Sequence, residues 1–282
     1  MVDFYIYAKS GHQIGFDSLK RAIAICKKLE KYEPTLLVTD FRAGEFAKNF
    51  GVKKYISVDI AENIANVAKR GDILIYDTNE IKPHIIKDMI DFFSLFIRVD
   101  QGSFEKIGDE ILISQFNKDS DIFGAVIDNR YYENSDNIEN KQALFFGDDD
   151  YYDILTGMIK DSSNIKMPLL LGHYFLYKNE KLLESKFNNL IEEEYYESVI
   201  KTTKYLLTAS PQAVFESIAS GNYPVYFQRA DKPTEYISII ENLNVPIINA
   251  LTIDELMDNF NTVIADYPNL KSIDTVIDDI DL

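Results

Sequence analysis

The chain has 282 residues, of which 46% are hydrophobic, and it carries a formal net charge of −17. This length favours two domains of about 140 residues each, and the apolar fraction lets both bury a core. The negative charge argues against nucleic acids and anionic membrane surfaces as partners, because both recruit a field of lysine and arginine that the chain as a whole lacks.

Strands and helices alternate along the first half of the chain. Short apolar runs predict strands, and apolar positions spaced three and four residues apart predict helices. We predict strands over 2–8, 35–40, 55–58, 72–77, 95–100 and 110–116, and helices over 18–32, 42–50, 60–69 and 82–93. Strands alternating with helices at this spacing favour a parallel sheet with right-handed crossovers.

A polar, Asn-rich stretch over 129–141 breaks the alternation and is interpreted as an interdomain linker. The pattern then restarts, which predicts domains over 1–135 and 136–282. We predict strands over 143–146, 167–172, 205–210, 224–228 and 245–250, and helices from 150, twice within 177–202, and over 211–220, 233–243 and 252–264. The acidic tail is expected to fray or to dock through its few apolar residues.

The loop after the first predicted strand has the features of an anion site. It reads KSGHQIGFDSLKR over 9–21, and its two glycines precede a helix for which Asp17 or Ser18 is a suitable N-cap. Backbone N–H groups and the helix dipole favour an anion there, whereas turn formation alone also explains the glycines. His12 lies in the same loop, and we weigh a role as catalytic base against a hydrogen bond within the turn.

The same loop carries a resemblance to a known family. The segment QIGFDSLKR resembles the first-loop motif, of Gly-Phe-Gly-His-x-x-Arg type, in the UDP-sugar hydrolases of pseudaminic acid synthesis. Gly15 and Arg21 match the motif, which implies that they bind the ligand. The family's second glycine falls on Asp17 and its essential histidine on Ser18, so these two occupy its catalytic positions. A serine without an adjacent base cannot replace that histidine as a general base.

Two further segments are similar to the same family. ILIYDTNE (73–80) resembles its apolar strand ending in an aspartate, which implies a catalytic position for Asp77. LLTASPQAVFESIASGNYPVYF (206–227) resembles the segment that holds the nucleotide there and in the related peptidoglycan N-acetylglucosaminyltransferase. That likeness implies that Ser210 opens a helix and that Glu216 hydrogen-bonds the ribose. The expected fold class is therefore α/β, with two doubly wound Rossmann-like domains facing a central cleft, the glycosyltransferase-B type.

The turn FGDDD (146–150) departs from the family pattern. It falls where the family has a Gly-Gly-Thr-Asp-like turn beside the diphosphate, and Gly147 is the matching glycine. The carboxylates of Asp148, Asp149 and Asp150 would repel a diphosphate. Two interpretations stay open, a bridging Mg²⁺ or Mn²⁺ ion or an acidic helix N-terminus. We assign no metal ligand among the site residues and expect no cofactor.

Two hypotheses about function follow from these motifs. In the first, the chain is a nucleotide-sugar hydrolase or a glycosyltransferase-like protein of bacterial surface or flagellar glycan biosynthesis, acting on a UDP-sugar or related small molecule. In the second, it is a catalytically degenerate relative that binds a ligand or a protein partner. The second rests on the joint loss of the family's histidine and of its diphosphate-turn glycine.

Cysteine usage and the N-terminus bear on the compartment. The single cysteine, Cys26, lies in an apolar helical pattern, so we expect it in a core; one cysteine excludes an intramolecular disulfide and a cysteine-based zinc site. The first residues do not read as a signal peptide, and no stretch reaches the roughly 18 apolar residues of a membrane span. We therefore expect a cytoplasmic protein without a transmembrane segment.

Overall fold

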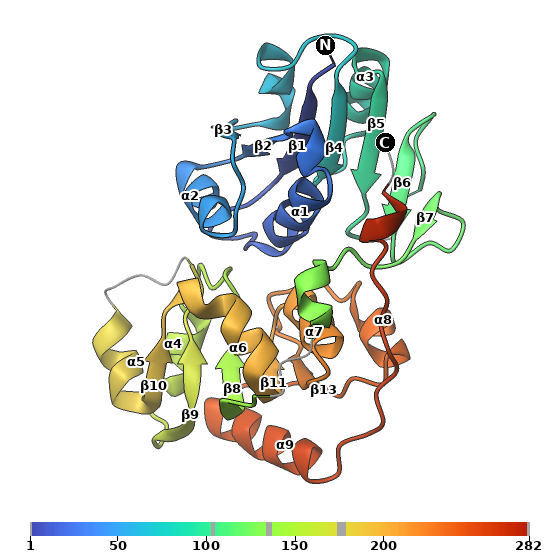
Figure 1. Cartoon of the computed structure of the whole chain (residues 1–282). Helices are drawn as coiled ribbons and strands as arrows, with labels where there is room; N and C mark the ends of the chain where they lie inside the picture. The colour runs from blue at the N-terminus through green and yellow to red at the C-terminus, as the bar shows by residue number, and fades with distance from the viewer. Residues whose placement is uncertain (1, 103–104, 134–136, 174–178, 281–282) are drawn as a thin grey trace. The chain divides into compact units, whose positions relative to one another are not determined.

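The computed structural model describes residues 2–102, 105–133, 137–173 and 179–280, which fall into two compact units (Figure 1). The first unit contains Met1–Gly11, Phe16–Asn129 and Asp274–Leu282, and the second contains His12–Gly15 and Arg130–Ile273. The predicted domain ranges differ from these units in two short segments as well as at the linker. Residues 12–15 group with the second unit, and the C-terminal tail groups with the first.

The first unit is built on a parallel sheet. Its strands are β1 (Phe4–Ala8), β2 (Thr35–Val38), β3 (Tyr55–Ser57), β4 (Ile73–Asp77), β5 (Leu95–Val99), β6 (Ile111–Ser114) and β7 (Ile122–Phe123). They lie in the order β3-β2-β1-β4-β5-β6-β7, and every ladder that joins them is parallel. The strand order reverses between β1 and β4, which is the switch point where doubly wound sheets bind ligands.

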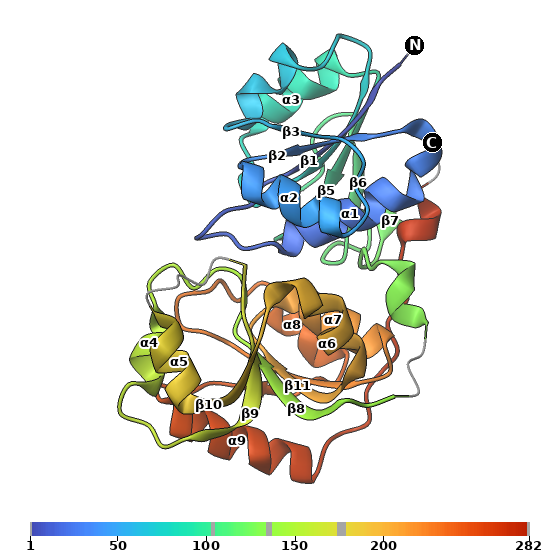
Figure 2. The same ribbon diagram turned by 60° about the vertical axis from the view of Figure 1, so that its left-hand side comes forward.

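Helices cover both faces of this first sheet. They are α1 (Asp17–Lys28), α2 (Phe41–Asn49) and α3 (Pro83–Phe92), with a 3₁₀ turn η2 (Ala61–Asn66). Helix α1 packs on β1 and β2, and Figure 2 shows α1 and α2 on one side of the sheet and α3 on the other. Strand side chains meet α3 and η2 in one core, which includes Tyr7, Leu74, Tyr76, Ile86 and Met89.

The second unit repeats this architecture. Its strands are β8 (Asn140–Phe145), β9 (Ile165–Leu170), β10 (Phe187–Ile191), β11 (Thr203–Thr208), β12 (Tyr223–Phe227) and β13 (Ile247–Ile248). Its helices are α4 (Ile154–Ile159), α5 (Glu180–Lys186), α6 (Tyr196–Thr202), α7 (Pro211–Ala219), α8 (Ile237–Asn242) and α9 (Ile253–Ala265). The parallel sheet runs β10-β9-β8-β11-β12-β13, so its switch point lies between β8 and β11.

Both faces of the second sheet are also covered. One face forms a core with α4, α5 and α9 that includes Phe146, Leu155, Leu183, Leu207 and Phe260. The other face carries α6 and α7, which Figure 2 shows across the sheet from α9. The predicted fold class, two doubly wound α/β domains, is therefore confirmed at the level of each unit.

The structure differs from the prediction in two helical regions. The helix predicted over 60–69 is the 3₁₀ turn η2, where the Asn63 amide bonds the carboxylate of Asp59 (2.7 Å) and so competes with a regular helix. The two helices predicted within 177–202 are present as α5 and α6, but the edge strand β10, which was not predicted, lies between them. Its sequence FNNLI has two asparagines, which are weak helix formers, and β9 supplies a parallel partner.

The acidic tail docks on the first unit. Val276, Ile277 and Ile280 are buried, and the Val276 N–H donates to the carbonyl of Ala125 (3.0 Å). Of the two outcomes expected for the tail, docking is the one observed for residues 274–280. Among the helices in the described part of the chain, none has both the length and the apolar character needed to cross a bilayer.

Candidate functional site

In the first unit, Arg21 and Asp77 form a buried ion pair across the switch point. Arg21 projects from α1, and its Nε and Nη2 lie 2.8 and 2.9 Å from the two carboxylate oxygens of Asp77 at the end of β4. Asp77 is 0% exposed and also accepts from the Gln101 amide. Burial raises the pKa of Asp77, and the paired guanidinium opposes that rise. The pair fastens α1 to β4, and a catalytic role for Asp77 stays a prediction.

Ser18 and Asp17 open α1, but neither is its N-cap. The N-cap residue is Phe16, which makes no side-chain cap, so the capping prediction is wrong. The buried Ser18 hydroxyl donates instead to the carbonyl of Lys9, just after β1. Asp17 is the first helical residue, and its carboxylate lies 3.8 Å from the ammonium of Lys20. Ser18 thus holds the first loop against the strand from which it leaves.

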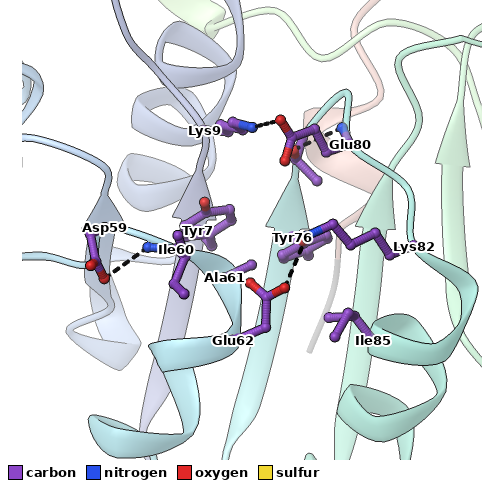
Figure 3. A pocket seen from close by; sticks show the side chains of 11 residues that line it. Tyr7, Lys9, Asp59, Ile60, Ala61, Glu62, Tyr76, Glu80, Lys82 and Ile85 are labelled. Carbon is purple, nitrogen blue, oxygen red and sulfur yellow. Dashed lines mark hydrogen bonds and ion pairs between the residues drawn. The ribbon is translucent and has the colours of Figure 1, made fainter.

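A small polar recess opens beside the same switch point (Figure 3). Its volume is about 60 Å³, and the stacked rings of Tyr7 and Tyr76, 5.2 Å apart, contribute to its lining. The Lys9 ammonium pairs with Glu80, and Lys82 reaches Glu62 at 3.0 Å. None of the predicted catalytic residues lines this recess, and its cations are already matched by carboxylates.

In the second unit, two turns meet backbone to backbone. Gly147 follows β8 with a φ of +109°, and Gly172 follows β9. A Cβ at Gly172 would lie closer than 3.0 Å to the carbonyl oxygen of Gly147 and 3.0 Å from the Cα of Asp148. Gly147 was a candidate from the sequence, whereas Gly172 was not. The signal that could have identified Gly172 is its place at the end of the predicted apolar strand MPLLLG.

Two of the three carboxylates in the acidic turn accept hydrogen bonds from backbone N–H groups. Asp148 is buried and accepts from the backbone N–H of His173 (2.9 Å). Asp150 accepts from the N–H groups of Ile154 and Leu155 at 2.7 and 3.0 Å, in the first turn of α4. Of the two open interpretations, the acidic helix N-terminus agrees with this geometry. Within the described residues, no group of three or more histidine, cysteine or acidic side chains could hold a metal ion.

The third carboxylate, Asp149, belongs to an ion-pair cluster. Arg229 is 1% exposed, and its Nη1 lies 2.6 Å from Asp149 while its Nη2 lies 2.6 Å from Asp231. Lys232 also pairs with Asp149, and the guanidinium lies 4.8 Å from the ring centroid of Phe146. Arg229 was not identified from the sequence. An arginine directly after the apolar strand PVYFQ was the available signal, because a buried charge requires a partner.

The first-loop residues that group with the second unit lie at this same turn. Gly15 has a φ of +82°, and a Cβ there would meet the Cβ of Asp149 at 3.2 Å. The His12 ring lies 6.4 Å from the ring of Tyr151 at an interplanar angle of 71°. The structure therefore brings Gly15, Gly147 and His12 to one turn, while Asp17, Ser18, Arg21 and Asp77 belong to the first unit.

Helix α7 carries the two predicted nucleotide-binding residues. Ser210 is its N-cap and accepts from the N–H of Ala213 at 3.1 Å. Glu216 is 2% exposed; it accepts from the hydroxyl of Tyr196 at 2.7 Å and from the amide of Gln212 at 3.0 Å. Tyr196 and Gln212 were not identified from the sequence. The i,i+4 spacing of Gln212 and Glu216 in a helix is the signal that could have found one of them.

No family model and no curated protein sequence matches this chain. Solved structures do match across most of it. A protein assigned as a UDP-N-acetylglucosamine 2-epimerase from Listeria monocytogenes has a TM-score of 0.59 at 10% identity, covering 94% of this chain and 89% of that one. S. aureus MnaA, in its co-structure with UDP, has a TM-score of 0.58 at 11% identity, covering 94% and 88%.

A calicheamicin glycosyltransferase, CalG4, has a TM-score of 0.53 at 13% identity, covering 94% of this chain and 91% of its own. At these identities the likeness establishes the fold alone. The chain therefore has the two-domain α/β fold of UDP-sugar epimerases and glycosyltransferases, which confirms the predicted glycosyltransferase-B type.

Proposed function

We propose that this chain binds the nucleotide of a UDP-sugar at the carboxyl edge of the second unit's sheet. The observation that carries the proposal is the arrangement on α7, where Ser210 caps the helix and Glu216 is held by Tyr196 and Gln212. This helix follows β11, which borders the switch point of the sheet. Ligands of open parallel sheets bind at that position.

The physical chemistry of this edge suits a nucleotide. The N-terminus of α7 carries the positive end of the helix dipole, which favours phosphate. Gly147 and Gly172 approach each other backbone to backbone just after β8 and β9, and β8 pairs with β11, which α7 follows. Among proteins of similar fold, S. aureus MnaA was solved with UDP, which supports uridine diphosphate as the first ligand to test.

We assign Glu216 to the ribose hydroxyls. Each oxygen of its carboxylate already accepts one hydrogen bond, and a carboxylate has about four lone-pair sites in total. Because Glu216 is 2% exposed, a bound ribose would take the place of one of its present neighbours. Of the Tyr196 hydroxyl and the Gln212 amide, the one that stays in place would keep the carboxylate oriented.

The reaction is the finer part of the proposal. Our first candidate is hydrolysis or glycosyl transfer on a UDP-sugar in bacterial surface or flagellar glycan biosynthesis, by analogy with the pseudaminic acid hydrolases that the first loop resembles. The second is a relative that binds its ligand or a protein partner without turnover. The state of the first unit favours the second candidate, because the Ser18 hydroxyl is bonded to Lys9 and Asp77 is paired with Arg21.

Calorimetric titration with UDP, with and without Mg²⁺, tests the nucleotide site. We expect saturable binding by the natural chain and at least about tenfold weaker binding by Glu216→Ala, because hydrogen bonds to a charged acceptor contribute about 1.5–3 kcal/mol each. Glu241→Ala, at an exposed position in α8 of the same unit, is the matched control and should bind as the natural chain does. Failure of the folded natural chain to bind UDP under either condition would refute the proposal.

Turnover is measured separately, as release of UDP from UDP-N-acetylglucosamine and UDP-glucose. Release that disappears in Asp77→Asn or His12→Ala, with UDP affinity retained, would favour the enzymatic candidate. UDP binding without any release would favour the binding-only candidate.

A further inference from the structure

Two exposed tyrosines follow the acidic turn of the second unit. Tyr151 is 52% exposed and Tyr152 is 69% exposed, although both are large aromatic side chains. Their rings meet edge to face, with centroids 5.1 Å apart and planes at 87°. The ring of His12 lies 6.4 Å from the ring of Tyr151, so three rings gather here. Adjacent exposed aromatics of this kind are common at binding sites.

The backbone on either side of the tyrosines is pinned. Before them, Asp150 accepts from the N–H groups at the start of α4. After them, Asp153 has a left-handed backbone with a φ of 55°, and its carboxylate accepts from the amide of Asn179 at 2.8 Å. A platform that is fixed before binding loses little conformational freedom on binding.

The tyrosine turn leaves the sheet beside the proposed nucleotide site. It follows β8, and β8 pairs in parallel with β11, with Phe145 opposite Thr208. Ser210 and the start of α7 come directly after β11. The tyrosines and the helix N-terminus therefore leave the same edge of the sheet on the two sides of its switch point.

We infer that Tyr151 and Tyr152 form the contact surface for the sugar ring of the ligand, an inference that rests on the proposed UDP-sugar function. A hexopyranose presents an apolar C–H face that packs on a flat aromatic ring, and its hydroxyls can pair with the phenol groups. The sugar class that this surface would take is a hexose or an N-acetylhexosamine.

The test compares ligands that share the nucleotide and differ in the sugar. Dissociation constants are measured by calorimetry for UDP and UDP-N-acetylglucosamine with the natural chain and with Tyr151→Ala/Tyr152→Ala. We expect the double variant to bind UDP within about twofold of the natural chain and UDP-N-acetylglucosamine about three- to tenfold more weakly. Tyr223→Ala is the control, because Tyr223 begins β12 and so lies at the amino ends of the strands, away from the carboxyl ends that border the proposed site.

The outcomes separate the inference from the function on which it rests. An unchanged ratio of UDP-N-acetylglucosamine to UDP affinity in the double variant would overturn the inference while leaving UDP binding in place. If the natural chain does not bind UDP, saturation-transfer NMR with free N-acetylglucosamine decides. Transfer that the double variant loses and Tyr223→Ala keeps would support the tyrosine surface, and no transfer to the natural chain would overturn it.

Discussion

Replacing Gly172 by alanine tests the backbone approach at the candidate site. The added Cβ would lie closer than 3.0 Å to the carbonyl oxygen of Gly147, 3.0 Å from the Cα of Asp148 and 3.1 Å from the carbonyl carbon of Gly147. All three atoms belong to the backbone, so no flexible side chain can move aside. One of the two turns must shift for the variant to fold.

The size of the effect follows from this crowding. Overpacking costs about 1–3 kcal/mol and sometimes more, and a backbone obstacle puts Gly172→Ala at about 3 kcal/mol. For a unit of about 150 residues, such as the second unit, 1 kcal/mol shifts the unfolding temperature by about 2–4 °C, so we expect a decrease of about 6–12 °C. Gly157→Ala should have the opposite sign, because Gly157 is an exposed position in α4 with no atom within 4 Å of a Cβ. Alanine is favoured there by about 0.5–1 kcal/mol.

Both variants are compared with the natural chain by circular dichroism during heating and by urea titration at fixed pH. Two substitutions of the same chemical kind in the same unit should move the midpoint in opposite directions. A Gly172→Ala variant that unfolds at or above the temperature of the natural chain would refute the close-approach argument. The UDP affinity of Gly172→Ala should also fall, because the shifted turn borders the proposed nucleotide site.

Two further predictions concern the first unit. Arg21→Ala should lower the free energy of unfolding by about 3–5 kcal/mol in urea titration, because it leaves Asp77 charged and buried; an unchanged midpoint would contradict the pair. Asp121 has a pKa below its ordinary value because Lys106 pairs with it. The pair therefore stabilises the folded chain above pH of about 4, and this stabilisation is lost as pH falls through the lowered pKa. Between pH about 5 and pH about 3, the free energy of unfolding should therefore fall less in Asp121→Asn than in the natural chain. Urea unfolding of both proteins at the two pH values measures this.

The elements that the sequence located well are those whose pattern is local. Buried parallel strands read as short apolar runs, as in Ile73–Asp77 and Tyr223–Phe227, and the structure places strands there. The N-cap at Ser210 was equally local, because a small polar residue before Pro211 is a common helix start. Both turns with a predicted glycine, at 15 and 147, have the positive φ that favours glycine.

The features that the sequence did not reveal depend on distant partners. Arg229 and Asp149 are 80 positions apart, and Arg98 finds Glu110 across a β5–β6 connection, with Nη2 2.6 Å from the carboxylate. No periodicity encodes such pairs. Ser18 is a different case. Its place in the first-loop motif predicted a catalytic position, whereas its hydroxyl donates to the carbonyl of Lys9 and holds the first loop. Edge strand β10 was missed because a parallel partner outweighed local preference.

The return of the C-terminal tail to the first unit affects the order in which the chain can fold during synthesis. The first 129 residues contain all seven strands of the first sheet, yet Val276, Ile277 and Ile280, which cover part of that unit, are made only after the second unit. The surface against which they pack therefore stays uncovered while the second unit is made. A fragment that ends after residue 129 would keep that surface exposed, and we expect a joined 1–129 and 274–282 fragment to be the smallest version of the unit that resists aggregation.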